Sequence, residues 1–353
     1  MNKWASKYIF KRRRFIKYSS LFLGSSVLHA CADNVRQAPS SNQDAKKLDK
    51  ITFGTNWLAQ AEHGGFYQAI ATGIYKDYGL DVTIKMGGSQ VASGTQLLLG
   101  GAVDFFMGQG VDAINAIAEG IPKITVAAIF QKDPQCLVAH PNTGVKTLPD
   151  LKGRPIYVST AGSITYWPLL KTRYGFTDDQ KRPYNFNPAP FLADKTSAQQ
   201  GYITSEPFAI EKQGGFKPVV FLLADNDYTA YATTIETKKE LVQKNPELVQ
   251  RFVDASIKGW YSYLQNPEPG NKLIKKDNPE MTDEQIKYGL QKLKEYGVIV
   301  SGDAEKLGIG AMTVERWQSF FDKMVKAGVF KPNTNYKGAF TLQFVNKGVQ
   351  TLL

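Results

Sequence analysis

The chain has 353 residues, 42% of them hydrophobic and 21% charged, so it is a globular protein long enough for two domains. Its formal net charge is +11, but seven of its lysines and arginines lie within residues 1–30, which contain no acid. Removing those seven from the 43 basic residues leaves 36 against 32 acids, a surplus of +4. Such a small surplus on a large surface excludes nucleic acid as the expected partner.

The N-terminus has the pattern of an export signal. A basic stretch over Lys11–Lys17 precedes a short apolar run over Leu21–Ala30, which is typical of a signal peptide. The run is too short to span a bilayer, which takes about 20 apolar residues. We therefore expect residues 1–30 to be a signal peptide and the polar residues 31–48 to form a flexible tether.

Two motifs within this segment resemble known export signals. Arg12 and Arg13 resemble a twin-arginine signal, and Leu28–Cys31 resembles a bacterial lipobox. The second resemblance implies that Cys31 becomes the lipidated first residue of an exported protein held at the periplasmic side of the cytoplasmic membrane. His29 departs from the lipobox pattern, in which a small residue is usual at that position.

Strands and helices alternate in the first part of the body. Apolar patterning predicts strands and helices in the order Ile51–Trp57, Phe66–Tyr78, Leu80–Lys85, Ser89–Leu99, Val103–Met107, Val111–Glu119 and Ile124–Phe130. The first, third, fifth and seventh of these are strands, and Gly79 is expected to end the first helix. Such alternation predicts a parallel sheet flanked by helices.

A second series follows Pro141. Its predicted helices are Leu148–Leu151, Tyr166–Tyr174 and Asp194–Gln199, and its predicted strands are Pro155–Ser159, Tyr184–Phe186, Gly201–Ser205 and Val219–Leu223. From Lys238 onward the chain is predicted to be mostly helical, with a helix start at Asn245–Glu247.

Two such series predict an α/β fold of two lobes with a helical C-terminal extension. We expect the chain to cross between the lobes near residues 131–138 and 224–233. Lobe 1 would then comprise residues 49–135 and 230–353, and lobe 2 residues 136–229. Ligands of open α/β sheets bind beyond the carboxyl ends of the strands, so two facing sheets predict a cleft that closes on a small molecule.

Three residues near the end of the first predicted strand are candidates for this cleft. Trp57 is either a core residue, the commoner fate of a lone tryptophan, or a stacking platform beside the hydrogen-bonding Asn56. His63, ahead of two glycines, is either a loop residue or a ligand contact. The only other histidines are His29 and His140, so the sequence predicts no metal cluster.

Four further candidates follow later strands. Gln109 lies between two glycines that bring bare backbone close to a ligand or form a plain turn. Ser163 belongs to a hydroxyl-rich turn that opens a helix, and Trp167 lies in the next predicted helix. Glu206 is either a solvated surface acid or an acceptor for two N–H groups of an amino-substituted ring. Catalytic sequence motifs are lacking, so we expect no enzyme.

Several segments resemble one family of transport proteins. They are Asn56–Trp57, His63–Tyr67, Gly73–Tyr75, Tyr78–Val82, Gly101–Asp104, Gly120–Pro122, Leu148–Gly153 and Thr204–Pro207. They resemble the solute-binding proteins of ABC transporters in the nitrate, sulfonate, taurine and thiamine-pyrimidine-precursor group, over roughly residues 50–260. The resemblance implies a monomeric Venus-flytrap protein of the periplasmic-binding fold that passes a small aromatic heterocycle to a membrane permease. Nitrate, sulfonate, taurine or a flavin are the alternative ligands.

The same superfamily contains thiamine pyrimidine synthases, which use pyridoxal phosphate and consume their own histidine. In those enzymes a lysine and a histidine lie four residues apart, just after the segment that corresponds to Gly101–Asp104. The corresponding window, Gly108–Asp112, contains neither. The cysteine-rich, iron-binding run of those enzymes also has no counterpart, since Cys136 is the only cysteine of the body. We therefore expect a binding protein without a cofactor, with the synthase as the alternative.

Overall fold

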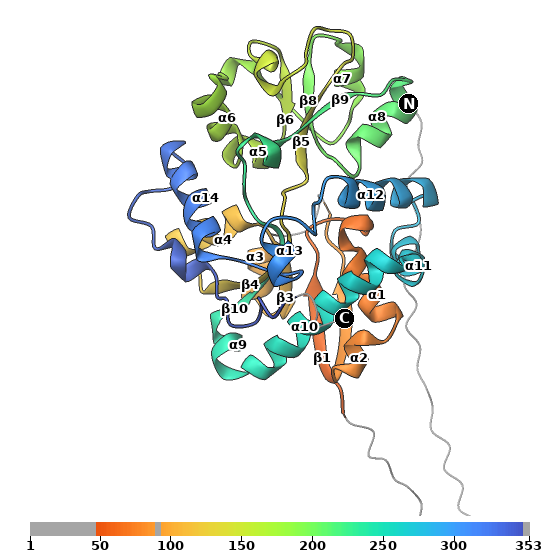
Figure 1. Cartoon of the computed structure of the whole chain (residues 1–353), viewed down its shortest axis with the longest axis vertical. Helices are drawn as coiled ribbons and strands as arrows, with labels where there is room; N and C mark the ends of the chain where they lie inside the picture. Colours follow the sequence, from red (N-terminus) through yellow and green to blue (C-terminus); the bar gives the residue numbers. More distant parts are fainter. Residues whose placement is uncertain (1–46, 89–92, 349–353) are drawn as a thin grey trace, which may run out of the picture. The chain divides into compact units, whose positions relative to one another are not determined.

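The computed structural model describes residues 47–88 and 93–348, which form a two-domain α/β fold with one five-stranded sheet in each lobe (Figure 1). The predicted fold class is thus confirmed. The sheet of lobe 1 has the order β2-β1-β3-β10-β4 and consists of β1 (Asp49–Gly54), β2 (Leu80–Lys85), β3 (Phe105–Gly108), β4 (Lys123–Phe130) and β10 (Ala232–Lys238). The sheet of lobe 2 has the order β7-β6-β8-β5-β9 and consists of β5 (Gln135–Ala139), β6 (Ile156–Val158), β7 (Lys181–Pro183), β8 (Ala198–Tyr202) and β9 (Val219–Leu222).

Both sheets are mixed, which corrects the expectation of parallel sheets. In lobe 1, β10 runs antiparallel to β3 and β4, and in lobe 2, β5 runs antiparallel to β8 and β9. These two strands are the first to follow each passage between the sheets, over residues 131–134 and 223–231. A strand that enters its sheet straight from the other lobe starts at the edge where the parallel strands end, so it runs in the opposite direction.

The helices that follow the first strands of lobe 1 are α1 (Gly64–Ala71), α2 (Ile74–Asp77), α3 (Gly94–Leu99) and α4 (Gly110–Ala118). The single helix expected over Phe66–Tyr78 is two helices, because Gly73 has a φ of 80°, a left-handed conformation that ends α1 and starts α2. Part of the helix expected over Ser89–Leu99 lies outside the described residues.

The predicted helical tail is present and packs on lobe 1 (Figure 1). It contains α9 (Lys239–Lys244), α10 (Pro246–Gln265), α11 (Glu268–Asp277), α12 (Asp283–Glu295), α13 (Asp303–Leu307) and α14 (Val314–Lys326). The expected helix start is confirmed, since the Asn245 side chain accepts a hydrogen bond from the Leu248 N–H at 3.1 Å. Phe252 of α10 stacks on Phe105 of β3 with ring centroids 4.0 Å apart. Each such buried ring stabilises the fold by about 1.5–3 kcal/mol.

Lobe 2 departs most from the predicted elements. Its helices are α5 (Thr160–Ile164), α6 (Trp167–Tyr174), α7 (Ala189–Ala193) and α8 (Glu206–Gly214), with short 3-10 turns at Leu148–Leu151, Asp178–Gln180 and Leu223–Asn226. The strand expected at Tyr184–Phe186 is wrong, because β7 ends at Pro183 and Phe186 has a φ of 58°. The helix expected at Asp194–Gln199 is also wrong. There α7 ends at Ala193, and Ala198 begins the central strand β8.

In the described residues, every helix is too short or too polar to cross a membrane. The signal peptide, Arg12, Arg13 and Cys31, together with nearly all of the tether, lie outside the described residues and stay predictions.

Candidate functional site

A cavity of about 270 Å³ is lined by both lobes, beyond the carboxyl ends of their parallel strands. We call it the cleft. Five of the predicted ligand-binding residues line it: Asn56, Trp57, His63, Gln109 and Glu206. Ser163 and Trp167 do not. Residues that sequence reasoning did not select also line it, among them Glu62, Asp112, Phe186, Gln200 and Tyr202.

Close packing of α1 on α10 holds His63 at the cleft. His63 ends a short 3-10 turn over Ala61–His63, directly before α1. A Cβ atom on Gly64 would lie 2.1 Å from the Tyr263 ring, and one on Gly65 would lie 2.2 Å from the Trp260 ring. These two glycines are therefore required for the close contact between the helices.

His63 is neutral and has an unsatisfied ring nitrogen. It is 1% exposed, and burial lowers its pKa to about 3, partly offset by a backbone hydrogen bond to Leu58. Its Nδ1 atom is buried without a hydrogen-bond partner in the described residues. Such an atom costs roughly 1–3 kcal/mol, which a ligand atom can recover by pairing with it.

Aromatic side chains from the two lobes meet across the cleft. The half-buried Trp57 follows β1, and its ring centroid lies 4.9 Å from that of Phe186, at an interplanar angle of 43°. Phe186 is 51% exposed and lies in the loop after β7. A flat ring between the two needs about 3.5–4 Å on each face, so Phe186 or its lobe must move for a ligand to stack on both.

The cleft residues Gln109 and Glu62 each form a hydrogen bond that joins the lobes. The Gln109 Nε2 atom donates to the Tyr202 hydroxyl at 3.0 Å, while Gln109 Oε1 is buried without a partner in the described residues. The Thr204 hydroxyl donates to Glu62 in a short hydrogen bond. Burial raises the pKa of Glu62 to about 7, although the bond from Thr204 lowers it. Glu62 is thus a carboxyl group that titrates near neutral pH.

Glu206 lines the cleft, as expected, and its carboxylate also accepts hydrogen bonds from lobe 2. The Tyr202 N–H donates to Glu206 Oε2 at 2.7 Å, and the Tyr184 hydroxyl donates to Oε1 at 3.4 Å. Burial raises the pKa of Glu206, and these hydrogen bonds oppose the shift. Each carboxylate oxygen can accept a further hydrogen bond, so Glu206 holds the start of α8 in place and still faces the cleft.

Trp167 is a core residue of lobe 2, which corrects its expected place in the cleft. It is 1% exposed, its Nε1 donates to Asp178 Oδ1 at 3.0 Å, and its ring packs on Phe176. Ser163 donates its backbone N–H to the Ser159 carbonyl, and the cleft is lined instead by its neighbours Ser159, Ala161, Ile164 and Thr165.

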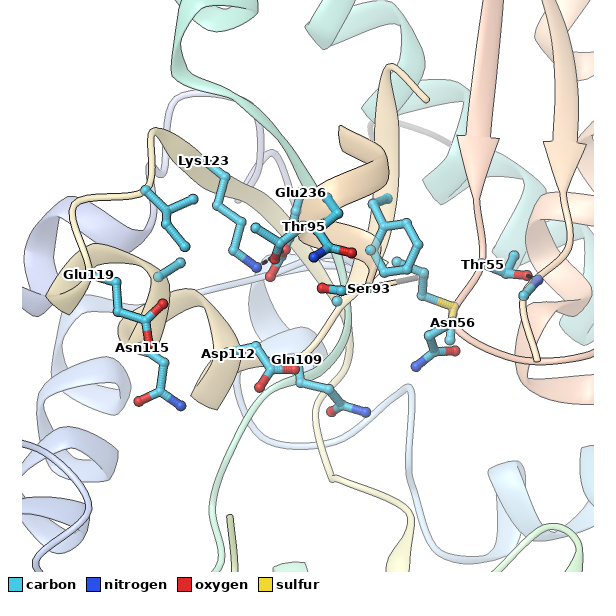
Figure 2. A pocket seen from close by; sticks show the side chains of 18 of the residues that line it. Thr55, Asn56, Ser93, Thr95, Gln109, Asp112, Asn115, Glu119, Lys123 and Glu236 are labelled. Atoms are coloured by element: carbon cyan, nitrogen blue, oxygen red, sulfur yellow. Dashed lines mark hydrogen bonds and ion pairs between the residues drawn. The ribbon is translucent and has the colours of Figure 1, made fainter. Parts of the chain in front are cut away.

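A larger cavity of about 560 Å³ adjoins the cleft (Figure 2). We call it the chamber. Its walls come from lobe 1, and it shares Asn56, Met107, Gln109 and Asp112 with the cleft. Groups of three or more potential metal ligands are absent from the part of the chain that the structure describes.

Two α/β domains with a cleft at the carboxyl ends of their strands define the periplasmic-binding-protein fold, and solved structures agree. The chain superposes on the periplasmic aliphatic sulphonate binding protein SsuA of Escherichia coli with a TM-score of 0.58, over 80% of this chain and 86% of that one, at 15% identity. Residues 60–269, more than half of the chain, match the profile of the family described as NMT1/THI5 like. The chain belongs to this family, which confirms the predicted resemblance.

Three curated relatives differ in their described roles. The riboflavin-binding protein RibY of Chloroflexus aurantiacus is 26% identical over 88% of this chain and 90% of its own length. The formylaminopyrimidine-binding protein of Halalkalibacterium halodurans is 22% identical over 73% and 78%. A 4-amino-5-hydroxymethyl-2-methylpyrimidine phosphate synthase of Saccharomyces cerevisiae is 26% identical over 64% and 74%.

Proposed function

We propose that this protein is an extracytoplasmic solute-binding lipoprotein that captures a flat nitrogen heterocycle in the cleft and delivers it to the permease of an ABC importer. The observation that carries the proposal is the composition of the cleft wall in lobe 1. There Trp57 lines the cleft together with His63 and Gln109, whose Nδ1 and Oε1 atoms are buried without partners among the described residues. A heterocycle matches this wall because it offers an apolar face for stacking and N–H or N groups at its edge.

The relatives support a pyrimidine or a flavin as the solute. Two of them are named for binding a pyrimidine derivative or riboflavin, and the riboflavin-binding relative aligns with most of this chain. Both ligands are flat rings with nitrogen atoms along their edges. Stacking alone does not distinguish them, so the choice depends on the groups that surround the ring.

Calorimetry on natively exported protein tests this proposal. We expect binding of riboflavin or of 4-amino-5-hydroxymethyl-2-methylpyrimidine, with weaker binding in Trp57→Ala than in the matched variant Trp57→Phe, which keeps a ring. Mass spectrometry of small molecules that co-purify gives an independent identification. If neither compound binds and only a sulfonate or nitrate does, the heterocycle proposal is wrong.

The synthase named among the relatives is the second candidate. Incubation with pyridoxal phosphate and iron separates the two. A binding protein yields neither a pyrimidine product nor the absorbance of a Schiff base, and either signal would favour the enzyme.

Membrane anchoring needs its own test. We expect Arg12→Lys combined with Arg13→Lys to retain the precursor inside the cell, and Cys31→Ser to release the exported protein from the membrane. Cys136→Ser is the matched control, because Cys136 is a buried thiol of lobe 2. Membrane retention of the Cys31→Ser protein would contradict lipidation.

A further inference from the structure

The chamber is a separate compartment beside the ring-binding cleft. Its volume of about 560 Å³ is larger than the 270 Å³ of the cleft, and the four residues common to both walls make them neighbours. A solute that consisted of a ring alone would leave the larger space to water. The chamber is therefore suited to a second part of the same solute.

The floor of the chamber is a built polar surface. The Lys123 Nζ atom donates to Glu236 Oε2 at 2.6 Å, and the two side chains are 4% and 2% exposed (Figure 2). A Cβ atom on Gly108 would lie 2.3 Å from the Glu236 carboxylate, so only glycine leaves room for that carboxylate under the end of β3. The ammonium and carboxylate groups neutralise each other, and each retains capacity for a further hydrogen bond.

One helix adds further polar groups to the lining of the chamber. Asp112, Asn115 and Glu119 all come from α4 or its C-terminal cap and line the chamber (Figure 2). Among the described residues, neither Asp112 nor Glu119 belongs to an ion pair, so the lining carries an excess of negative charge. This excess disfavours a phosphate or a sulfonate, since like charges repel, and solvent weakens the repulsion because Asp112 and Glu119 are exposed.

Both donors and acceptors line the chamber. Lys123 and the Asn115 amide donate, whereas the carboxylates and the unpartnered Gln109 Oε1 accept. An amine could only donate to such a lining. A hydroxyl group both donates and accepts, so a chain of uncharged hydroxyls satisfies both kinds of group at once.

We propose that the chamber binds an uncharged polyhydroxyl side chain of a solute whose flat ring occupies the cleft. This inference rests on the proposed function, and it makes a ring with a polyol chain, as in riboflavin, the preferred solute over a bare pyrimidine. The cleft selects the ring, and the chamber selects the substituent and its charge.

Three flavins that share one ring test this directly. Riboflavin has a polyol chain, lumiflavin has a methyl group in its place, and flavin mononucleotide adds a phosphate to the polyol. We expect calorimetry to give riboflavin an affinity at least about tenfold above that of lumiflavin, since tenfold corresponds to roughly 1.4 kcal/mol, a hydrogen bond or two. Flavin mononucleotide should bind more weakly than riboflavin because of the carboxylates.

Two chamber variants localise the effect. Asn115→Leu should remove the advantage of riboflavin and leave lumiflavin binding unchanged, and Glu119→Gln should narrow the gap between riboflavin and flavin mononucleotide. Glu211→Gln, an exposed change on α8 of lobe 2, is the matched control.

Equal affinities for riboflavin and lumiflavin, or an Asn115→Leu effect of the same size on both, would overturn the chamber proposal. If only the aminopyrimidine binds, in a manner that depends on Trp57, the chamber proposal fails and the proposed function stands. If no heterocycle binds, both fail.

Discussion

The two walls of the cleft differ in how their polar groups are satisfied. In lobe 1, His63 Nδ1 and Gln109 Oε1 are buried without partners in the described residues. In lobe 2, Gln200 Oε1 accepts from the Ser159 N–H at 2.6 Å and from the Tyr166 hydroxyl at 3.0 Å, and Glu206 accepts from its own lobe. Lobe 1 is therefore the wall that gains from ligand contact, and lobe 2 is a preformed surface.

The two lobes therefore contribute to ligand binding in different ways. A ligand that pairs with the unsatisfied atoms of lobe 1 recovers roughly 1–3 kcal/mol for each. Lobe 2 makes few new hydrogen bonds of its own, but it excludes water and presents Phe186. Closure then depends on the ligand because the closed state completes contacts on both sides.

The largest expected effect would come from lobe 2, on stability rather than binding. Glu206→Ala removes the acceptor of the Tyr202 N–H, and hydrogen bonds to charged groups contribute about 1.5–3 kcal/mol. We expect its free energy of unfolding to fall by roughly 2–3 kcal/mol in urea denaturation, and that of Glu206→Gln to fall less because the amide oxygen still accepts.

The affinity of the folded Glu206→Ala protein for riboflavin should change little by comparison. Unchanged stability combined with loss of binding would mean that Glu206 contacts the ligand directly, and the contrast between the walls would be lost.

His63, a residue of the lobe 1 wall, should make the stability of the protein depend on pH. Its pKa is lowered from 6.5 to about 3 on burial, so the unfolded chain takes up a proton between these values and the folded chain does not. Stability is fully present above pH 6.5 and is lost as pH falls, by about 2 kcal/mol at pH 5 for this one group. Urea denaturation at pH 7.5 and pH 5 measures how much stability each protein loses on acidification. We expect His63→Asn to lose about 2 kcal/mol less than the wild type, and Glu211→Gln to behave as the wild type. If His63→Asn and the wild type showed the same pH dependence of stability, His63 would be protonated in the folded protein.

Variants of Trp57 and Phe186 compare how much each wall of the cleft contributes to ligand affinity. Trp57 is half-buried and lines the cleft with the lobe 1 residues that hold the unsatisfied atoms, whereas Phe186 is 51% exposed. Stacking contributes about 0.5–1.5 kcal/mol beyond the area buried, so Trp57→Ala should weaken riboflavin binding by about tenfold or more. Phe186→Ala should weaken it less in the same calorimetric titration. The reverse order would make lobe 2 the principal stacking surface.

The sequence alone predicts the bounds of an element well where a local run of apolar residues decides which side chains are buried. The strands β2 and β4 and the helix α4 lie close to their predicted bounds, because the apolar pattern within each segment shows which residues face the core. The place of Trp57 at the cleft follows from its position after a parallel strand.

Lobe 2 could not be predicted as well, because long-range hydrogen bonds decide its elements. Strand β8 has the sequence Ala-Gln-Gln-Gly-Tyr, which is poor in strand formers, and its Gln200 is satisfied by Ser159, 41 positions away. Trp167 is in the core because Asp178 accepts its N–H, and nothing in its helical position distinguishes that fate from a place in the cleft. The unpartnered atoms of lobe 1 likewise become visible only in three dimensions.

The smallest expected effect concerns Glu62, which, like Gln109, connects lobe 1 to lobe 2 by a hydrogen bond. Burial raises its pKa from 4.5 to about 7, although the bond from Thr204 across the cleft lowers it, so the buried, closed state favours the protonated carboxyl. Closure therefore weakens as pH rises through 7, because ionisation adds the cost of a buried charge. Between pH 6 and pH 8 the affinity for riboflavin should fall by up to about tenfold, the limit reached if Glu62 regains its ordinary pKa on opening. Small-angle X-ray scattering of the ligand-free protein should show a larger radius of gyration at pH 8, and Glu62→Gln, which cannot ionise, should remove both changes. A pH dependence that persists in Glu62→Gln would assign it to another group and leave the contact with Thr204 without a role in closure.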